Sequence, residues 1–158
     1  MAETQYVTLC LGTEVFAVPV AMVHEILDYR DSFRIPEGPE YLIGLIDVRG
    51  RGVPVIDLRK KLGLQPVEPG LTTRIMVIAV PLGDRVLALG LVADKVLEVV
   101  SFDTDELDAA PDVGIPWRSD YIAGVARRNG SFVVIFDLPK LLTATEAALL
   151  SSAAGLAA

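Results

Sequence analysis

The segment Tyr41-Leu42-Ile43-Gly44-Leu45 returns later in the chain as Tyr121-Ile122-Ala123-Gly124-Val125. With no gap inserted, the same alignment superposes Gly50 on Gly130. An internal match of this length indicates a duplicated structural unit. Further matched segments are Asp57-Leu58 with Asp137-Leu138, Phe16-Ala17-Val18 with Leu87-Ala88-Leu89, and Val23-His24-Glu25-Ile26 with Val96-Leu97-Glu98-Val99.

Short apolar runs rich in Val, Ile and Leu fill both copies, and Gly, Pro, Asp or Asn bounds each run, as is typical of β-strands. We therefore expect an all-β chain, a single domain over residues 1–158 with two repeated subdomains at about 5–65 and 71–142. Each copy is small enough to need the other for its core. The runs are 6–11, 14–18, 42–48, 53–56, 75–80, 86–92, 96–100, 121–127 and 132–136.

Helical signals are few and short. Asp57 and its counterpart Asp137 are expected to cap the short helices that follow them. Residues 21–27 could hold one helical turn. The pattern Thr143 to Glu146 is a capping box, which predicts a C-terminal helix over about 144–151.

Composition excludes several classes of function. The net charge of −7 and the sequence pI of about 4.6 argue against binding to nucleic acid or to an anionic membrane surface. The sequence has neither a signal peptide nor an apolar run long enough to span a bilayer, which predicts a cytoplasmic protein without direct membrane insertion. With one histidine, His24, and one cysteine, Cys10, it offers no catalytic triad, no metal site and no phosphate loop. Cys10 lies in an apolar run and is expected to be buried and inert.

Features present in only one copy are the candidates for function, because features present in both serve the shared scaffold. Arg49 is such a feature, since Asn129 takes its place in the second copy. Glu25 and Glu98, in contrast, are equivalent. We expect Arg49 and Glu25 to approach each other at the surface, and Glu98 to have no such partner at Asn129.

The stretch from Gly44 to Leu58 resembles the signature of the CheW family of bacterial chemotaxis adaptors, G-V-x-N-L-R-G-x-x-x-P-V-x-D-L. The resemblance extends from about Gln5 to about Ser152. The chain departs from the signature at Asp47-Val48, where the family usually has Asn-Leu.

This resemblance implies two intertwined five-stranded SH3-like barrels with short helices, and a non-enzymatic adaptor role without a cofactor. CheW-like proteins bridge the cytoplasmic tip of chemoreceptors (methyl-accepting chemotaxis proteins) to the regulatory domain of the histidine kinase CheA. They act in membrane-associated receptor arrays. The resemblance thus implies a cytoplasmic protein recruited to such arrays and monomeric when isolated.

The resemblance also assigns contact residues by position. Those for the receptor are Val20, Val23, Glu25, Arg49 and Met76, and those for the kinase are Val7 and Val18. For the valines, core packing is an equally good interpretation. Two other classes stay open: a CheW-like regulatory domain of a larger signalling kinase, and an enzyme whose reactive groups the sequence does not display.

Overall fold

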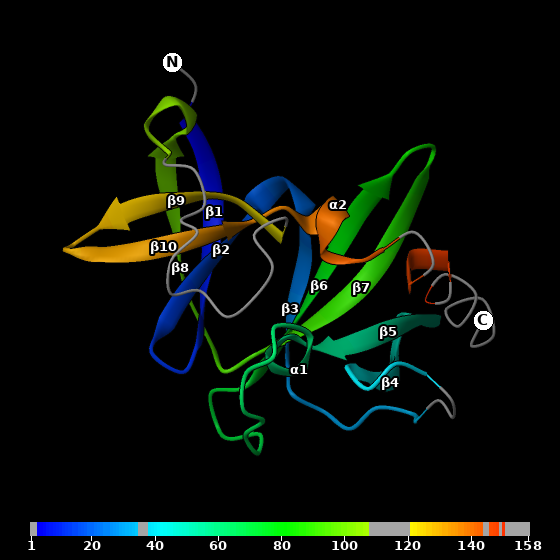
Figure 1. Cartoon of the computed structure of the whole chain (residues 1–158). Helices are drawn as coiled ribbons and strands as arrows, with labels where there is room; N and C mark the ends of the chain where they lie inside the picture. The colour runs from blue at the N-terminus through cyan, green and yellow to red at the C-terminus, as the bar shows by residue number, and fades with distance from the viewer. Residues whose placement is uncertain (1–2, 35–37, 108–120, 144–145, 149, 151–158) are drawn as a thin grey trace.

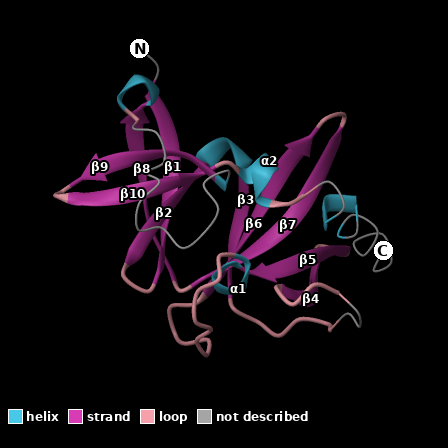
Figure 2. Cartoon of the chain, viewed as in Figure 1, coloured by secondary structure: helices cyan, strands magenta, loops and turns pink. Residues whose placement is uncertain are grey.

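The computed structural model describes residues 3–34, 38–107, 121–143, 146–148 and 150 (Figure 1). Figure 2 shows that strands dominate and that the helices are short. In chain order the elements are β1 (Glu3–Leu11), β2 (Glu14–Pro19), the 3-10 turn η1 (Val20–Met22), β3 (Val23–Asp28), β4 (Leu42–Val48), β5 (Arg51–Asp57), α1 (Leu58–Lys61), β6 (Arg74–Leu82), β7 (Arg85–Ala93), β8 (Lys95–Asp103), the 3-10 turn η2 (Thr104–Glu106), β9 (Ile122–Arg128), β10 (Ser131–Phe136) and α2 (Leu138–Leu141).

The strands form two five-stranded curled sheets, which confirms the expected all-β fold of two intertwined barrels. We call the sheet with strand order β8-β1-β2-β10-β9 sheet A, and the sheet with order β3-β6-β7-β5-β4 sheet B. The two sheets stand side by side in Figure 1, with α1 and α2 between them.

The first hairpin of each repeat pairs into the sheet of the other repeat. Hairpin β1–β2 belongs to the first repeat but pairs with β8 and β10, and hairpin β6–β7 belongs to the second but pairs with β3 and β5. In each sheet the crossing hairpin pairs in parallel with the last strand of the other repeat. Strand β2 pairs with β10, with Val15 opposite Val133, and β7 pairs with β5, with Gly90 opposite Val55. The boundaries at about 5–65 and 71–142 thus describe the repeat in the sequence, whereas each sheet takes strands from both repeats.

The alternation of side chains along the strands builds a core in three parts. Within β2, Phe16 and Val18 face a large cluster that both sheets share, and Ala17 faces the inside of sheet A. Phe16 stacks on Phe136 in the shared cluster, with ring centroids 4.9 Å apart. A smaller cluster that includes Ile75 fills the inside of sheet B. The shared cluster means that neither sheet buries its apolar residues without the other.

Three sequence expectations about helices meet different outcomes. The single turn expected at 21–27 is present as the 3-10 turn Val20–Met22, but it ends at Met22 and the remaining residues belong to β3. Asp57 caps α1 as expected, and its Oδ1 accepts from the amides of Arg59 and Lys60 at 2.9 and 3.4 Å. Asp137 makes no hydrogen bond from its side chain to cap α2. Pro139 occupies the position equivalent to Arg59, and proline has no N–H to donate.

The capping box near the C-terminus is present. The hydroxyl oxygen of Thr143 accepts from the amide of Glu146 at 3.1 Å, and the amide of Thr143 donates to the Glu146 carboxylate at 2.9 Å. Residues 146–148 and 150 are helical, and the rest of the predicted helix at 144–151 lies outside the described residues. Leu150 is fully buried in the shared cluster, so this segment is docked on the core.

A polar cluster joins this C-terminal segment to both repeats. The ammonium of Lys61, whose side chain is only 7% exposed, lies 3.0 and 3.2 Å from the two carboxylate oxygens of Glu146. It also lies 4.6 and 5.3 Å from the ring centroids of Tyr41 and Tyr121, the two tyrosines that open the repeated segment. The Tyr41 hydroxyl donates to Glu146. Cation–π contacts and a paired carboxylate are the partners a buried lysine requires.

Burial raises the pKa of Glu146, but hydrogen bonds from the Thr143 amide, the Tyr41 hydroxyl and the Lys61 ammonium outweigh burial and lower it to about 2. Because the folded pKa is depressed, the stabilisation is present above the ordinary value of 4.5 and is lost as the pH falls towards 2.

We predict that Glu146→Gln lowers the free energy of unfolding by about 1–2 kcal/mol at neutral pH, because the buried Lys61 ammonium loses its anionic partner. The difference from the wild type should shrink as the pH falls from 4.5 towards 2. Urea unfolding across this range measures it. The control is Glu40→Gln, which changes an exposed glutamate next to Tyr41 in the sequence and should leave the free energy of unfolding nearly unchanged. A deficit that stays constant down to pH 2 contradicts the role of Glu146.

Candidate protein-binding site

A β-bulge in β3 sets the direction of Glu25. Val23 lies opposite Ile78 and Glu25 opposite Val77, so His24 is an extra residue without a partner on β6. The bulge turns Glu25 to the face of Leu27 and Val77, the inside of sheet B, whereas Val23 faces the shared cluster. Bulges commonly re-aim a side chain beside a functional site.

Arg49 occupies the tip of the β4–β5 hairpin. Both turn residues have positive φ, 54° at Arg49 and 83° at Gly50, which is the signature of a type I′ turn. Asparagine and glycine favour this turn, and the second repeat has them at Asn129 and Gly130, with φ values of 52° and 78°. An arginine in the left-handed region costs about 1 kcal/mol relative to a residue that tolerates it. The first repeat carries this cost at the position where the two copies differ.

The expected approach of Arg49 and Glu25 is confirmed. Arg49 Nη2 lies 3.6 Å from Glu25 Oε2, which is an ion pair without a close hydrogen bond. The Arg49 side chain is 80% exposed and that of Glu25 is 21% exposed. The guanidinium therefore stands in solvent with its donors available, held on one side by a half-buried carboxylate.

Asp47 and Arg30 brace the same hairpin. Asp47 Oδ1 accepts from the amide of Gly50 at 2.8 Å, and the Asp47 carbonyl accepts from Arg30 at 2.6 Å. An asparagine could accept the Gly50 amide through its side-chain oxygen equally well, so the departure from the expected Asn at this position preserves the turn.

The expectation that Glu98 lacks an arginine partner is wrong. Arg128, the last residue of β9, donates to Glu98 Oε1 at 2.7 Å. A bulge also recurs in β8, where Val99 and Val96 lie opposite Val7 and Leu9. A glutamate–arginine pair at a bulge is thus a property of both repeats, but only the first takes its arginine from the tip of the turn.

The remaining predicted contact residues lie deeper. Val20 and Val23 are half-buried and pack against the shared cluster. Met76, Val18 and Val7 are buried in that cluster, with exposures of 0%, 0% and 6%. Packing explains all three, and a partner reaches their side chains only if the sheets open. Their role in binding stays a prediction.

Comparison with known proteins agrees with this architecture. Residues 5–146 match the model of the CheW-like domain family. The chain belongs to the CheW-like family. It is 31% identical over 150 residues to the chemotaxis protein CheW of Klebsiella aerogenes, covering 95% of this chain and 88% of that protein. It is 34% identical over 141 residues to CheW of Bacillus subtilis, covering 89% and 86%. A crystal structure of the scaffolding protein TtCheW from Thermoanaerobacter tengcongensis superposes with a TM-score of 0.80 at 26% identity, covering 92% of each chain.

Family membership makes the chain a chemotaxis scaffold or adaptor protein and not an enzyme. Among the described residues, no three His, Cys, Asp or Glu side chains are grouped so that they could hold a metal ion. No helix in the part of the CheW-like chain that the structure describes is long and apolar enough to cross a membrane.

Cys10 is less buried than the sequence predicts. It lies on β1, but it is half-buried rather than buried. Burial raises the pKa of its thiol, opposed by the charge of Lys95, so less thiolate forms at neutral pH.

Sequence reasoning missed Arg59. Arg59 donates to both carboxylate oxygens of Asp94, from Nε at 3.1 Å and from Nη2 at 2.5 Å. The comparison of the two copies contained the signal, because Pro139 replaces Arg59 in the second.

We predict that Arg49→Asn does not lower the melting temperature of this CheW-like protein. Its free energy of unfolding should stay the same or rise by up to about 1 kcal/mol. Asparagine suits the turn better, and the lost surface ion pair contributes little. The reciprocal change Asn129→Arg should destabilise by about 0.5–1 kcal/mol. Thermal and urea unfolding measure both variants. Clear destabilisation by Arg49→Asn would show that Arg49 is retained for stability.

Proposed function

We propose that this CheW-like protein couples the cytoplasmic tip of chemoreceptors to the histidine kinase CheA, working in the cytoplasm at membrane-associated receptor arrays. The observation that carries the proposal concerns Arg49, which is exposed and has a left-handed backbone conformation. The second repeat has Asn129, the residue type that this turn favours, at the equivalent position. A residue that costs stability and remains solvent-exposed is better explained by binding than by folding.

The receptor surface is proposed to centre on Arg49 and Glu25, with Val20 and Val23 behind them. An ion pair between exposed groups stabilises by only about 0–1 kcal/mol, so stability gives little reason to keep it. Its use would be to orient the guanidinium fork, so that less conformational entropy is lost when it donates to a receptor helix. Half-buried valines beside a charged centre fit an apolar helix face with a polar rim.

The kinase surface is proposed to lie on sheet A, where β1 and β2 carry Val7 and Val18. Because both side chains are buried, we propose that they shape these strands rather than contact the partner directly. Met76 would act in the same way in sheet B, where it lies opposite Ile26, which is 42% exposed.

The alternative, a regulatory domain of a larger signalling kinase, predicts a different context. The relatives compared above carry the name chemotaxis protein CheW, which supports the adaptor proposal. Capture from a lysate of the source cells tests it. Recovery of receptor and kinase as separate chains supports the adaptor, whereas a kinase catalytic domain on the same polypeptide supports the alternative.

We predict that Arg49→Ala weakens binding to receptor-containing membranes by at least about tenfold. Glu25→Ala should weaken binding more mildly, because the guanidinium is retained but less well oriented. Cosedimentation with receptor vesicles, with and without kinase, is the measurement.

Arg128→Ala is the matched control, since it breaks the equivalent ion pair in sheet A and should leave receptor binding intact. Asn129→Ala should likewise have no effect. Equal losses for Arg49→Ala and Arg128→Ala, or unfolding of Arg49→Ala, would refute the assignment of Arg49 to the receptor.

A further inference from the structure

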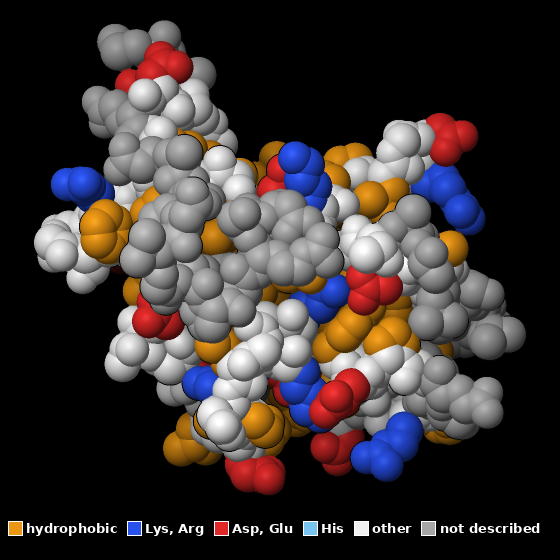
Figure 3. All heavy atoms as spheres, viewed as in Figure 1, with side chains coloured by type: hydrophobic (Ala, Val, Ile, Leu, Met, Phe, Trp, Pro, Cys, Tyr) orange, Lys and Arg blue, Asp and Glu red, His pale blue; other side chains and the backbone are white. Residues whose placement is uncertain are grey.

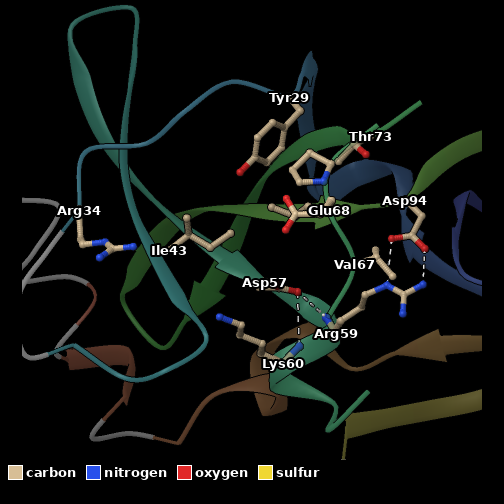
Figure 4. Close-up of a pocket in the computed structure, with 12 residues that line it drawn as sticks. Tyr29, Arg34, Ile43, Asp57, Arg59, Lys60, Val67, Glu68, Thr73 and Asp94 are labelled. Carbon is tan, nitrogen blue, oxygen red and sulfur yellow. Dashed lines mark hydrogen bonds and ion pairs between the residues drawn. The ribbon is translucent and has the colours of Figure 1, made fainter. Parts of the chain in front are cut away.

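A pocket of about 370 Å³ lies beside the base of the β4–β5 hairpin, where Ile43 and Asp57 line it, and neither Arg49 nor Gly50 at the tip of the turn does. Its volume is within the range of small-molecule sites. The apolar part of the lining includes Ile43 on β4, Val67 in the segment between α1 and β6, and the ring of Tyr29 (Figure 4). Val92 on β7 and Pro69 complete it.

One wall is held rigidly. The Arg59 side chain joins Asp94 by two hydrogen bonds and donates to the carbonyl of Gln65 at 2.8 Å, which fixes the segment that carries Val67. Asp94 also accepts from the amide of Gly12 at 2.7 Å. The hydrogen bonds from Arg59 keep the pKa of Asp94 below its ordinary value, so both groups stay charged and paired. Neither is free for a ligand.

Other charged groups around the pocket have no ion pair or hydrogen bond from their side chains within the described structure. They are the Arg34 guanidinium, the Lys60 ammonium and the Glu68 carboxylate, and Figure 4 shows all three pointing toward Ile43 from different sides. The Tyr29 hydroxyl points toward the same space. In Figure 3, acidic and basic side chains lie next to each other on the lower part of the molecule.

This set of groups limits the chemistry of an occupant. Glu68 and the carboxylate of Asp57 disfavour a simple anion, and Arg34 with Lys60 disfavours a simple cation. A molecule that carries both charges on one small centre, with an apolar group beside them, offers a partner to Arg34, Lys60 and Glu68 at once.

We propose that this pocket binds a small zwitterion of the α-amino-acid class with an apolar side chain. Its carboxylate accepts from Lys60 and Arg34, its ammonium donates to Glu68, and its side chain lies on Ile43, Val67 and Val92. Binding there gives the adaptor a ligand-responsive surface separate from the receptor site, and it does not depend on the proposed coupling function.

The test uses the isolated full chain, uniformly labelled with ¹⁵N, and three probes of the same shape. L-leucine carries both charges, 4-methylpentanoate lacks the ammonium and 3-methylbutylamine lacks the carboxylate. We expect saturable shifts of the Ile43, Val67 and Val92 amides with L-leucine, with a dissociation constant of about 1 mM for so open a pocket. Each single-charge analogue should bind at least about tenfold more weakly.

Charge-removing variants assign the two ends of the ligand. Lys60→Met should weaken L-leucine at least about fivefold without changing the amine, and Glu68→Gln should weaken L-leucine without changing 4-methylpentanoate. Lys140→Met removes the counterpart of Lys60 on α2 and should change nothing. The proposal is overturned by the absence of saturable shifts up to about 20 mM L-leucine, by equal binding of an analogue, or by an equal effect of Lys140→Met.

Discussion

Each sheet of this protein is completed by a hairpin that belongs, in sequence, to the other repeat. Hairpins β1–β2 and β6–β7 cross over, and each pairs antiparallel with one strand and parallel with another strand of the other repeat. The crossing hairpins also carry many of the side chains of the shared apolar cluster. Neither repeat can therefore form a closed sheet or a core by itself, and the two sheets fold as one cooperative unit. The Lys61 cluster, where the two repeats and the C-terminal segment meet, depends on this arrangement.

Much of the strand content could be predicted from the sequence, but the exchange of hairpins could not be predicted from the residues. The repeat shows which segments are equivalent, and equivalent segments pair equally well within a copy or between copies. Only the resemblance to a known family indicated intertwined barrels. The strand β3 was missed because it directly follows a 3-10 turn and alternates half-buried residues with exposed ones. The alignment of Val23–Ile26 with Val96–Val99 nonetheless contained the information, since the second segment is strand-like in composition.

For the candidate site, comparison of the two copies predicted the Glu25–Arg49 pair but misjudged its counterpart. Arg128 is one position away from the residue that was compared, and a strand-end side chain reaches as far as a turn residue does. The bulge at His24 was also unpredictable, because one extra residue in a strand leaves no mark on composition. What the comparison does reveal is conformational: the same turn is built once from Asn-Gly and once from Arg-Gly, and only one of these is the favoured pair.

The crossing of the hairpins has a consequence for biosynthesis. A ribosome releases β1 and β2 first, but their neighbours β8 and β10 begin only at Lys95 and Ser131. The first hairpin therefore emerges with two open edges and waits for nearly the whole chain to be translated before it can be paired. Exposed edges of this kind are where nascent chains aggregate. The strands after β2 find their partners sooner, so sheet B can close around β6 and β7 while sheet A is still incomplete. The order of synthesis thus favours sheet B as the template on which the shared core is assembled.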